Sequence, residues 1–132
     1  MNAQRPSKKQ RSGAAAYKRG YMVEYIARLY LRCKGYKIIA KNYKTPVGEI
    51  DIIARKGRIT AFIEVKYRAD KTDALYAVPI RTQKRVSRAA EHFIAHNSRY
   101  TQGNTPNYTL RFDIIACAQP YSIVHIKNAW LQ

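Results

Sequence analysis

Three carboxylates and a lysine lie close together in the segment GEIDIIARKGRITAFIEVK, which spans residues 48–66. They are Glu49, Asp51, Glu64 and Lys66, and they interrupt two apolar stretches of a chain that has 8 acidic residues against 25 basic ones. Carboxylates gathered in one place repel one another, and in water such an arrangement persists only if a cation or a proton relieves the repulsion. Mg²⁺ is the natural cation, because it prefers oxygen ligands and needs only one or two carboxylates beside water and substrate phosphate oxygens.

The chemistry that this set of residues favours is metal-assisted hydrolysis of a phosphodiester bond. Asp51 and Glu64 would be the metal ligands, and Lys66, on the same strand face as Glu64, would donate to the attacking water or to the phosphate. The alternative is a set of cross-strand ion pairs on a solvated face, each contributing about 0.2–1 kcal/mol. The position of Asp51 and Glu64 among isoleucines weakens that alternative.

Two strands joined by a tight turn would bring these residues together. Lys56-Gly57 supplies a glycine where a hairpin needs positive φ, and a two-residue loop there places Glu49 opposite Glu64 and Asp51 opposite Phe62. The charged residues then share one sheet face. The other face is predicted to be apolar and to carry Ile50, Ile52, Ala54, Ile59, Ala61, Ile63 and Val65.

The elements around this hairpin follow from hydrophobic periodicity and from turn signals. We expect a helix over about 14–34 stopped by Gly35, a strand over 36–43, a helix from an N-cap at Thr82 to about His96, and strands over 108–118 and 122–130. The order α-β-β-β-α-β-β predicts an α/β fold with a mixed central sheet flanked by helices. Residues 1–13 are polar and basic and read as a flexible arm, which leaves 14–132 as a single domain.

The charge of the chain limits its partners. The formal net charge of +17 and the pI near 10.2 favour an acidic partner, and the 11 tyrosines among basic residues slightly favour nucleic acid. The alternative, and the more common situation, is that tyrosines such as Tyr17, Tyr21, Tyr25 and Tyr30 pack a helix. No apolar run is long enough for a membrane span, and the N-terminal residues of this sequence lack the apolar segment that a secretory signal needs. From these two features we expect a cytoplasmic protein without membrane association. Cys33 and Cys117 lie far apart and lack the spacing of a zinc site.

Several other polar residues have simpler interpretations. Asp113 alternates with apolar neighbours and could pair with Arg111 or Arg68, which makes it a structural residue. The three histidines, His92, His96 and His125, show no metal-ligand spacing and are expected at the surface or in packing.

Asp51, followed after the hairpin by Glu64-Val65-Lys66, resembles the D…ExK signature of the restriction-endonuclease-like nuclease superfamily, and the element order resembles its core. More closely, the chain resembles the YraN-like family of endonuclease-like proteins. The similarity runs from Gly20 to about Trp130 and comprises Glu24 with Ala27, Gly35-Tyr36, Asn42-Tyr43, GEIDIIA, FIEVKYR, Gln83, Ala89-Ala90, RFDIIA and HIKNAW.

This resemblance implies a restriction-endonuclease-like core and assigns roles to the residues of the hairpin. Asp51, Glu64 and the backbone carbonyl of Val65 would hold Mg²⁺ or Mn²⁺, and Lys66 would be the catalytic lysine. Glu24 on the first predicted helix would be a further catalytic carboxylate.

Two of the acidic residues keep an alternative role. Glu24 could instead form an ion pair with Arg28, four residues along the helix. Glu49 would either orient the metal ligands without binding the metal itself, or offset the positive charge of nearby lysines.

The surface that would contact nucleic acid lies on the second predicted helix. Thr82 stands where the family often has lysine, so this contact is expected from Gln83, Lys84, Arg85 and Arg88, with Arg68 from the preceding loop.

The sequence therefore predicts a nucleic-acid-binding protein that acts as a magnesium-dependent endonuclease on DNA, with branched or junction DNA as a candidate substrate. The alternative is a non-catalytic basic module that binds DNA or RNA and retains the nuclease fold, because a fold alone does not decide function. The sequence does not decide whether the protein forms a homodimer. Symmetric cutting of a four-way junction would favour one.

Overall fold

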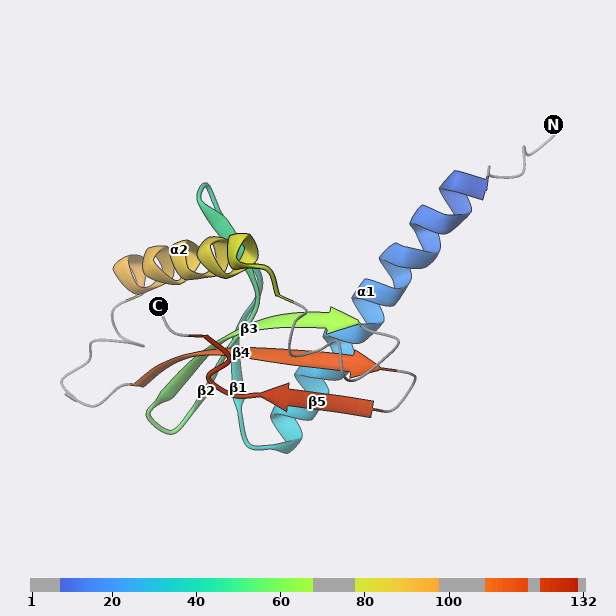
Figure 1. Ribbon diagram of the computed structural model, residues 1–132. Helices are drawn as coiled ribbons and strands as arrows, with labels where there is room; N and C mark the ends of the chain where they lie inside the picture. The colour runs from blue at the N-terminus through green and yellow to red at the C-terminus, as the bar shows by residue number, and fades with distance from the viewer. Residues whose placement is uncertain (1–7, 68–77, 98–108, 119–121, 131–132) are drawn as a thin grey trace.

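The computed structural model describes residues 8–67, 78–97, 109–118 and 122–130 (Figure 1). The elements in chain order are α1 (Lys8–Cys33), β1 (Lys37–Thr45), β2 (Gly48–Lys56), β3 (Ile59–Tyr67), α2 (Ile80–His96), β4 (Thr109–Ala118) and β5 (Ser122–Ile126). This order and the mixed α/β class are those that the sequence predicts.

The strands form one sheet in the order β1-β2-β3-β4-β5. β1, β2 and β3 are antiparallel neighbours, β4 runs parallel to β3, and β5 is antiparallel to β4. A parallel pair needs a crossover connection, and α2 lies in the segment that joins β3 to β4. The predicted mixed sheet is therefore confirmed.

The two helices cover opposite faces of this sheet (Figure 1). The apolar cluster on one face contains α1 residues Val23, Ala27 and Leu31. The cluster on the other face contains α2 residues Val86, Ala89, Ala90 and Phe93. Ile53 and Phe62, which strand alternation puts on the face predicted for the charged residues, are fully buried in the α2 cluster. That face is a packed layer and not a solvated one.

Both helices begin earlier than predicted. α1 begins at Lys8, so residues 8–13 of the predicted arm are helical, and residues 1–7 lie outside the described residues. The helix stops as expected at Gly35, which has φ +90°. α2 begins directly after Pro79, and no side-chain hydrogen bond caps it, so Thr82 is not the N-cap. Proline at this position is favourable because its fixed φ and missing N–H suit a helix start.

The register of the β2–β3 hairpin differs from the prediction by two residues. Lys56 pairs with Ile59 and Ile52 with Ile63, so the turn consists of Gly57 and Arg58. Gly57, with φ +58°, is the first turn residue and not the second. A shift of two keeps every side chain on its face, because strand alternation has a period of two. Continued by one residue, this register brings Asp51 level with Glu64 instead of Phe62.

Regular pairing of β2 is interrupted on both of its sides at Asp51. Toward β1, the register passes from Lys41↔Ile52 to Tyr43↔Ile50 and skips Asn42 and Asp51. Toward β3, the paired positions end at Ile52↔Ile63. Ile50 consequently packs in the α2 cluster and Ile52 in the α1 cluster, which strict alternation does not permit. The predicted apolar face is therefore wrong at Ile50.

A buried charge cluster joins β4 to β5. Asp113 is fully buried and accepts hydrogen bonds from Arg111 Nε and Nη2 at 2.8 Å each. His125 Nε2 at 2.8 Å and the backbone N–H of Asn128 at 3.0 Å complete its surroundings. The predicted pairing with Arg111 is confirmed, and His125 is a polar partner and not merely a packing residue. Arg68, the other predicted partner, lies outside the described residues.

Candidate active site

Asp51 lies where β2 ceases to pair with β3, at a position that is also skipped in the pairing of β2 with β1. Its Oδ2 accepts a hydrogen bond from the backbone N–H of Val65 at 2.8 Å. Burial raises the pKa of the Asp51 carboxyl, and this hydrogen bond opposes the rise only in part. Asp51 is half-buried, so its carboxyl group stays open to solvent and to a ligand.

Glu64 and Lys66 on β3 complete a group of three. The Glu64 carboxyl lies within hydrogen-bonding reach of Asp51, and its Oε1 is 3.2 Å from Lys66 Nζ. Burial first, and then the charge of Asp51, raise the pKa of Glu64 to about 7 despite the opposing effect of Lys66. Two carboxyls in this position do not both ionise easily, because each charge disfavours the other.

The structure brings together the three residues of the D…ExK pattern. Asp51, Glu64 and Lys66 come together from adjacent strands. Among the described residues, no arginine forms a hydrogen bond or ion pair with either carboxylate.

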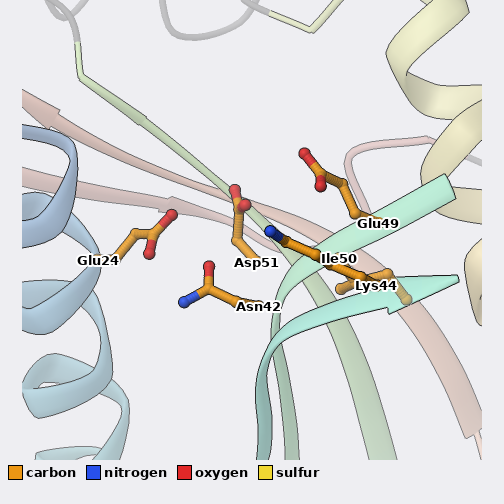
Figure 2. A pocket seen from close by; sticks show the side chains of 6 residues that line it. All are labelled: Glu24, Asn42, Lys44, Glu49, Ile50 and Asp51. Atoms are coloured by element: carbon orange, nitrogen blue, oxygen red, sulfur yellow. The ribbon is translucent and has the colours of Figure 1, made fainter. Parts of the chain in front are cut away.

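An open pocket of about 200 Å³ lies beside Asp51, and Figure 2 shows the side chains that line it. Glu24 points from α1 toward Asp51 across this pocket (Figure 2). Burial, followed by the charge of Asp51, raises the pKa of Glu24, and a hydrogen bond with Asn42 opposes the rise. Glu64 and Lys66 do not line the pocket, so Asp51 is the link between them and Glu24.

The alternative role of Glu24, an ion pair with Arg28, is absent from the described residues. The Arg28 guanidinium instead lies 5.8 Å from the centre of the Tyr25 ring. Its charge still lowers the pKa of Glu24, but less than burial and Asp51 raise it.

Glu49 and two residues that sequence reasoning did not assign to the site also line this pocket. Glu49 is exposed, and its charge adds a small contribution, after burial and closer neighbours, to the raised pKa of Asp51. The unassigned residues are Asn42 and Lys44 on β1. Asn42 has φ +49°, and asparagine adopts this left-handed region more readily than most residues. An asparagine inside a strand was the available signal, since strands are depleted in it.

The donor set suits a hard divalent cation but is small. Among the described residues, no group of three or more histidine, cysteine, aspartate or glutamate side chains is arranged to hold a metal ion. Asp51 and Glu64 are nonetheless two oxygen donors in contact, with raised pKa values. Mg²⁺ needs no more than one or two carboxylates when water and phosphate complete its shell. The residues therefore fit Mg²⁺ or Mn²⁺ held jointly with a substrate.

The residues expected to contact nucleic acid lie on α2. Lys84, Arg85 and Arg88 are exposed. Gln83 is half-buried, and its Nε2 donates to the Val78 carbonyl at 3.0 Å. Arg68, the fifth of these residues, is outside the described residues.

A close backbone contact joins α2 to the candidate site. A Cβ atom added to Gly48 would overlap the Arg85 carbonyl oxygen. The glycine of the GEID segment therefore lets α2 approach the start of β2.

Comparison with known proteins shows to which family this chain belongs. The model of the family described as "Uncharacterised protein family UPF0102" matches residues 23–117, which contain the candidate site. The chain belongs to the UPF0102 family. This is the YraN family that the sequence motifs resemble.

Several UPF0102 relatives match most of the chain. A UPF0102 protein of Chelativorans sp. (strain BNC1) is 37% identical over 115 residues, 87% of this chain and 89% of the relative. One from Bradyrhizobium diazoefficiens is 44% identical over 116 residues, 88% of this chain and 84% of the relative. One from Sinorhizobium medicae is 45% identical over 101 residues, 76% of this chain and 79% of the relative. Their names state no activity.

Within the described residues, neither helix of this UPF0102 protein has the length and apolar character that a membrane span requires.

Proposed function

We propose that this UPF0102 protein is a metal-dependent nuclease that hydrolyses phosphodiester bonds in nucleic acid, most directly DNA. The observation that carries the proposal is the convergence of three side chains from adjacent strands in a chain of net charge +17: Asp51, held by the Val65 N–H, lies near Glu64, whose Oε1 is 3.2 Å from Lys66 Nζ. Two carboxylates with raised pKa values suit a divalent cation. A strongly basic surface suits a polyanion.

Each residue has a role in this proposal. Asp51, Glu64 and the Val65 carbonyl would hold Mg²⁺ or Mn²⁺, which when bound polarises a phosphoryl oxygen and lowers the pKa of a water. The Val65 N–H fixes the orientation of Asp51 through its hydrogen bond to Oδ2. Lys66 Nζ, which is 3.2 Å from Glu64 Oε1, would donate to the attacking water or to the phosphate. Glu24, which faces Asp51 across the pocket (Figure 2), would act as a further catalytic carboxylate that accepts a proton.

The proposal is tested by incubating plasmid, linear and four-way-junction DNA with purified protein and Mg²⁺ or Mn²⁺, and in parallel with EDTA. We expect cleavage that needs the metal and falls about 100-fold or more in Asp51→Asn and Lys66→Ala. Glu91→Gln, on exposed α2 surface, removes one carboxylate outside the site and serves as the control. Cutting that persists unchanged in both site variants would reveal a contaminating nuclease.

A second candidate is a nucleic-acid-binding module without turnover. Two observations favour it: the described residues hold no cluster of three or more metal-ligating side chains, and Lys66 is engaged in an ion pair with Glu64. In this case wild-type protein cuts none of the three DNA forms with either metal. Its affinity for DNA is unchanged in Asp51→Asn and falls steeply with salt, because phosphate contacts release counterions.

A further inference from the structure

A second open groove, of about 390 Å³, runs between α1 and the edge strand β1. Its α1 wall consists of Tyr21, Tyr25, Arg28 and Arg32, and its β1 wall of residues 38–41. We call it the α1–β1 groove. The four α1 residues follow a spacing of 4, 3 and 4, which places them on one helical face. At 1.5 Å per residue, they line roughly 16 Å of groove.

The two tyrosines of the groove are exposed. Tyr21 is 63% exposed and Tyr25 is 49% exposed. Half-buried tyrosines need no special explanation, but two exposed tyrosines with cations on the same helix face are suited to stacking with the bases of a nucleic acid. Arg32 and Lys41 are exposed cations of the same groove.

Arg28 provides an independent indication that the groove binds an anion. It is only 7% exposed, and it lies over the Tyr25 ring at 5.8 Å. Among the described residues no hydrogen bond or ion pair within 4 Å holds it, and its charge interacts with the Glu24 carboxyl only at longer range. A buried charge with no direct partner is costly, and an anionic ligand in the groove would offset that cost.

The groove and the Asp51 pocket are lined by residues that are adjacent in sequence on both α1 and β1. Tyr25 of the groove follows Glu24 of the pocket, and Lys41 of the groove precedes Asn42 of the pocket. A nucleic-acid strand that extends beyond the groove past these residues would reach Asp51.

We propose that the α1–β1 groove binds unpaired nucleotides of a nucleic-acid strand, with bases stacked on Tyr21 and Tyr25 and phosphates facing Arg28, Arg32 and Lys41. Bases inside a duplex have both faces covered by their neighbours, so only an unpaired segment can stack in this way. Resting on the proposed function, this assigns the substrate class: nucleic acid with a single-stranded segment beside the bond to be cut, as in a flap, a gap or a single strand.

The test measures binding in EDTA, so that no hydrolysis enters the result. Fluorescence anisotropy follows a labelled single-stranded oligodeoxynucleotide of roughly 15 nucleotides, and a blunt duplex of the same length. We expect Tyr21→Ala and Tyr25→Ala each to raise the Kd for the single strand about tenfold and to change the Kd for the duplex little. Tyr21→Phe, which keeps the ring, retains binding.

Two control variants distinguish an effect of the groove from an effect of removing any apolar side chain of α1 or any positive charge. Leu29→Ala removes another exposed apolar side chain of α1 that does not line the groove, and it leaves the Kd unchanged. Lys127→Ala removes an exposed charge outside the groove, and it weakens binding less than Lys41→Ala does.

The outcomes distinguish this inference from the proposed function. Equal losses for single strand and duplex, or no loss in either tyrosine variant, would overturn the groove assignment even if the protein cuts DNA. Selective single-strand binding by a protein that never cuts would refute the nuclease proposal and leave the groove assignment in place. A change of oligomeric state in Tyr25→Ala without a change in Kd would assign the groove to a second copy of the chain and overturn the proposal.

Discussion

The backbone N–H of Val65 on β3 donates a hydrogen bond to Oδ2 of Asp51 on β2, at 2.8 Å. The bond lies just beyond the last regular pair of the hairpin, Ile52↔Ile63. A side-chain oxygen thus accepts a backbone donor at the position where the two strands separate. This bond holds the aspartate in the opening and brings its carboxyl beside Glu64.

Replacing Glu64 by glutamine should stabilise the protein at alkaline pH. The folded-state pKa of Glu64 is raised to about 7, so between about pH 4.5 and 7 the folded state binds more protons than the unfolded state. Stability therefore falls as pH rises through this window, and Glu64→Gln removes that loss. We expect a gain of about 1–3 kcal/mol at pH 8.5 and almost none at pH 4, measured by urea denaturation. A gain of equal size at both pH values would argue against a buried, repelled carboxylate.

Magnesium should stabilise the wild-type protein, and more strongly at pH 8 than at pH 6. The metal binds ionised carboxylates, so it competes with the proton that Glu64, with a pKa raised to about 7, holds at pH 6. A Mg²⁺ concentration ten times the Kd would add about 1.4 kcal/mol, visible as a rise in Tm. The rise should be lost in Asp51→Asn and in Glu64→Gln. NaCl at matched ionic strength is the control, and an equal rise with NaCl would exclude a specific site.

Asn42 should tolerate glycine far better than valine. Its φ of +49° costs a β-branched residue about 1–2 kcal/mol, whereas glycine adopts the same backbone freely. Asn42→Gly should therefore unfold close to the wild-type denaturant concentration, and Asn42→Val well below it. Asn42→Gly also removes the hydrogen bond to Glu24, so its DNA cleavage reports on the Glu24 side chain separately from stability. Equal stability of the two variants would mean that the left-handed backbone is not maintained.

Asp113→Asn should destabilise the fold at neutral pH and much less in acid. Burial alone would raise the pKa of Asp113, but hydrogen bonds from His125 and Arg111 outweigh burial and hold the pKa below its ordinary value. A lowered folded-state pKa contributes stability above the unfolded pKa, and this contribution is lost as pH falls through the folded-state value. We expect a loss of about 3 kcal/mol at pH 7 that shrinks toward pH 3. A loss of stability that does not depend on pH would mean that the charge of Asp113 does not stabilise the fold, and that the altered hydrogen bonding of the amide causes the loss.

Gly48→Ala should separate α2 from the start of β2. Because the new Cβ would overlap the Arg85 carbonyl oxygen, the helix has to move, at a cost of about 1–3 kcal/mol. Gly57→Ala is the contrasting variant: nothing lies near its Cβ, and only its φ of +58° opposes the change. If Gly48→Ala shifts the α2 resonances of a backbone NMR spectrum no more than Gly57→Ala does, the close approach is not present in solution.

Much of this protein follows from its sequence alone. Hydrophobic periodicity gave the order of helices and strands and the mixed sheet, because each pattern reflects burial along one element. The D…ExK spacing also grouped Asp51, Glu64 and Lys66, since a register error of two residues does not by itself change the face of any side chain.

Tertiary structure decided what no local pattern contains. The interruption of pairing at Asp51 and Asn42 depends on two neighbouring strands at once, and it places Ile50 and Ile52 in opposite layers. The approach of Glu24 to Asp51 and the groove beside it depend on how α1 crosses the sheet. The pKa of Glu64 depends on burial by residues distant in sequence. Desolvation and charge proximity are set by three-dimensional packing, so a one-dimensional pattern can nominate these residues but cannot fix their chemistry.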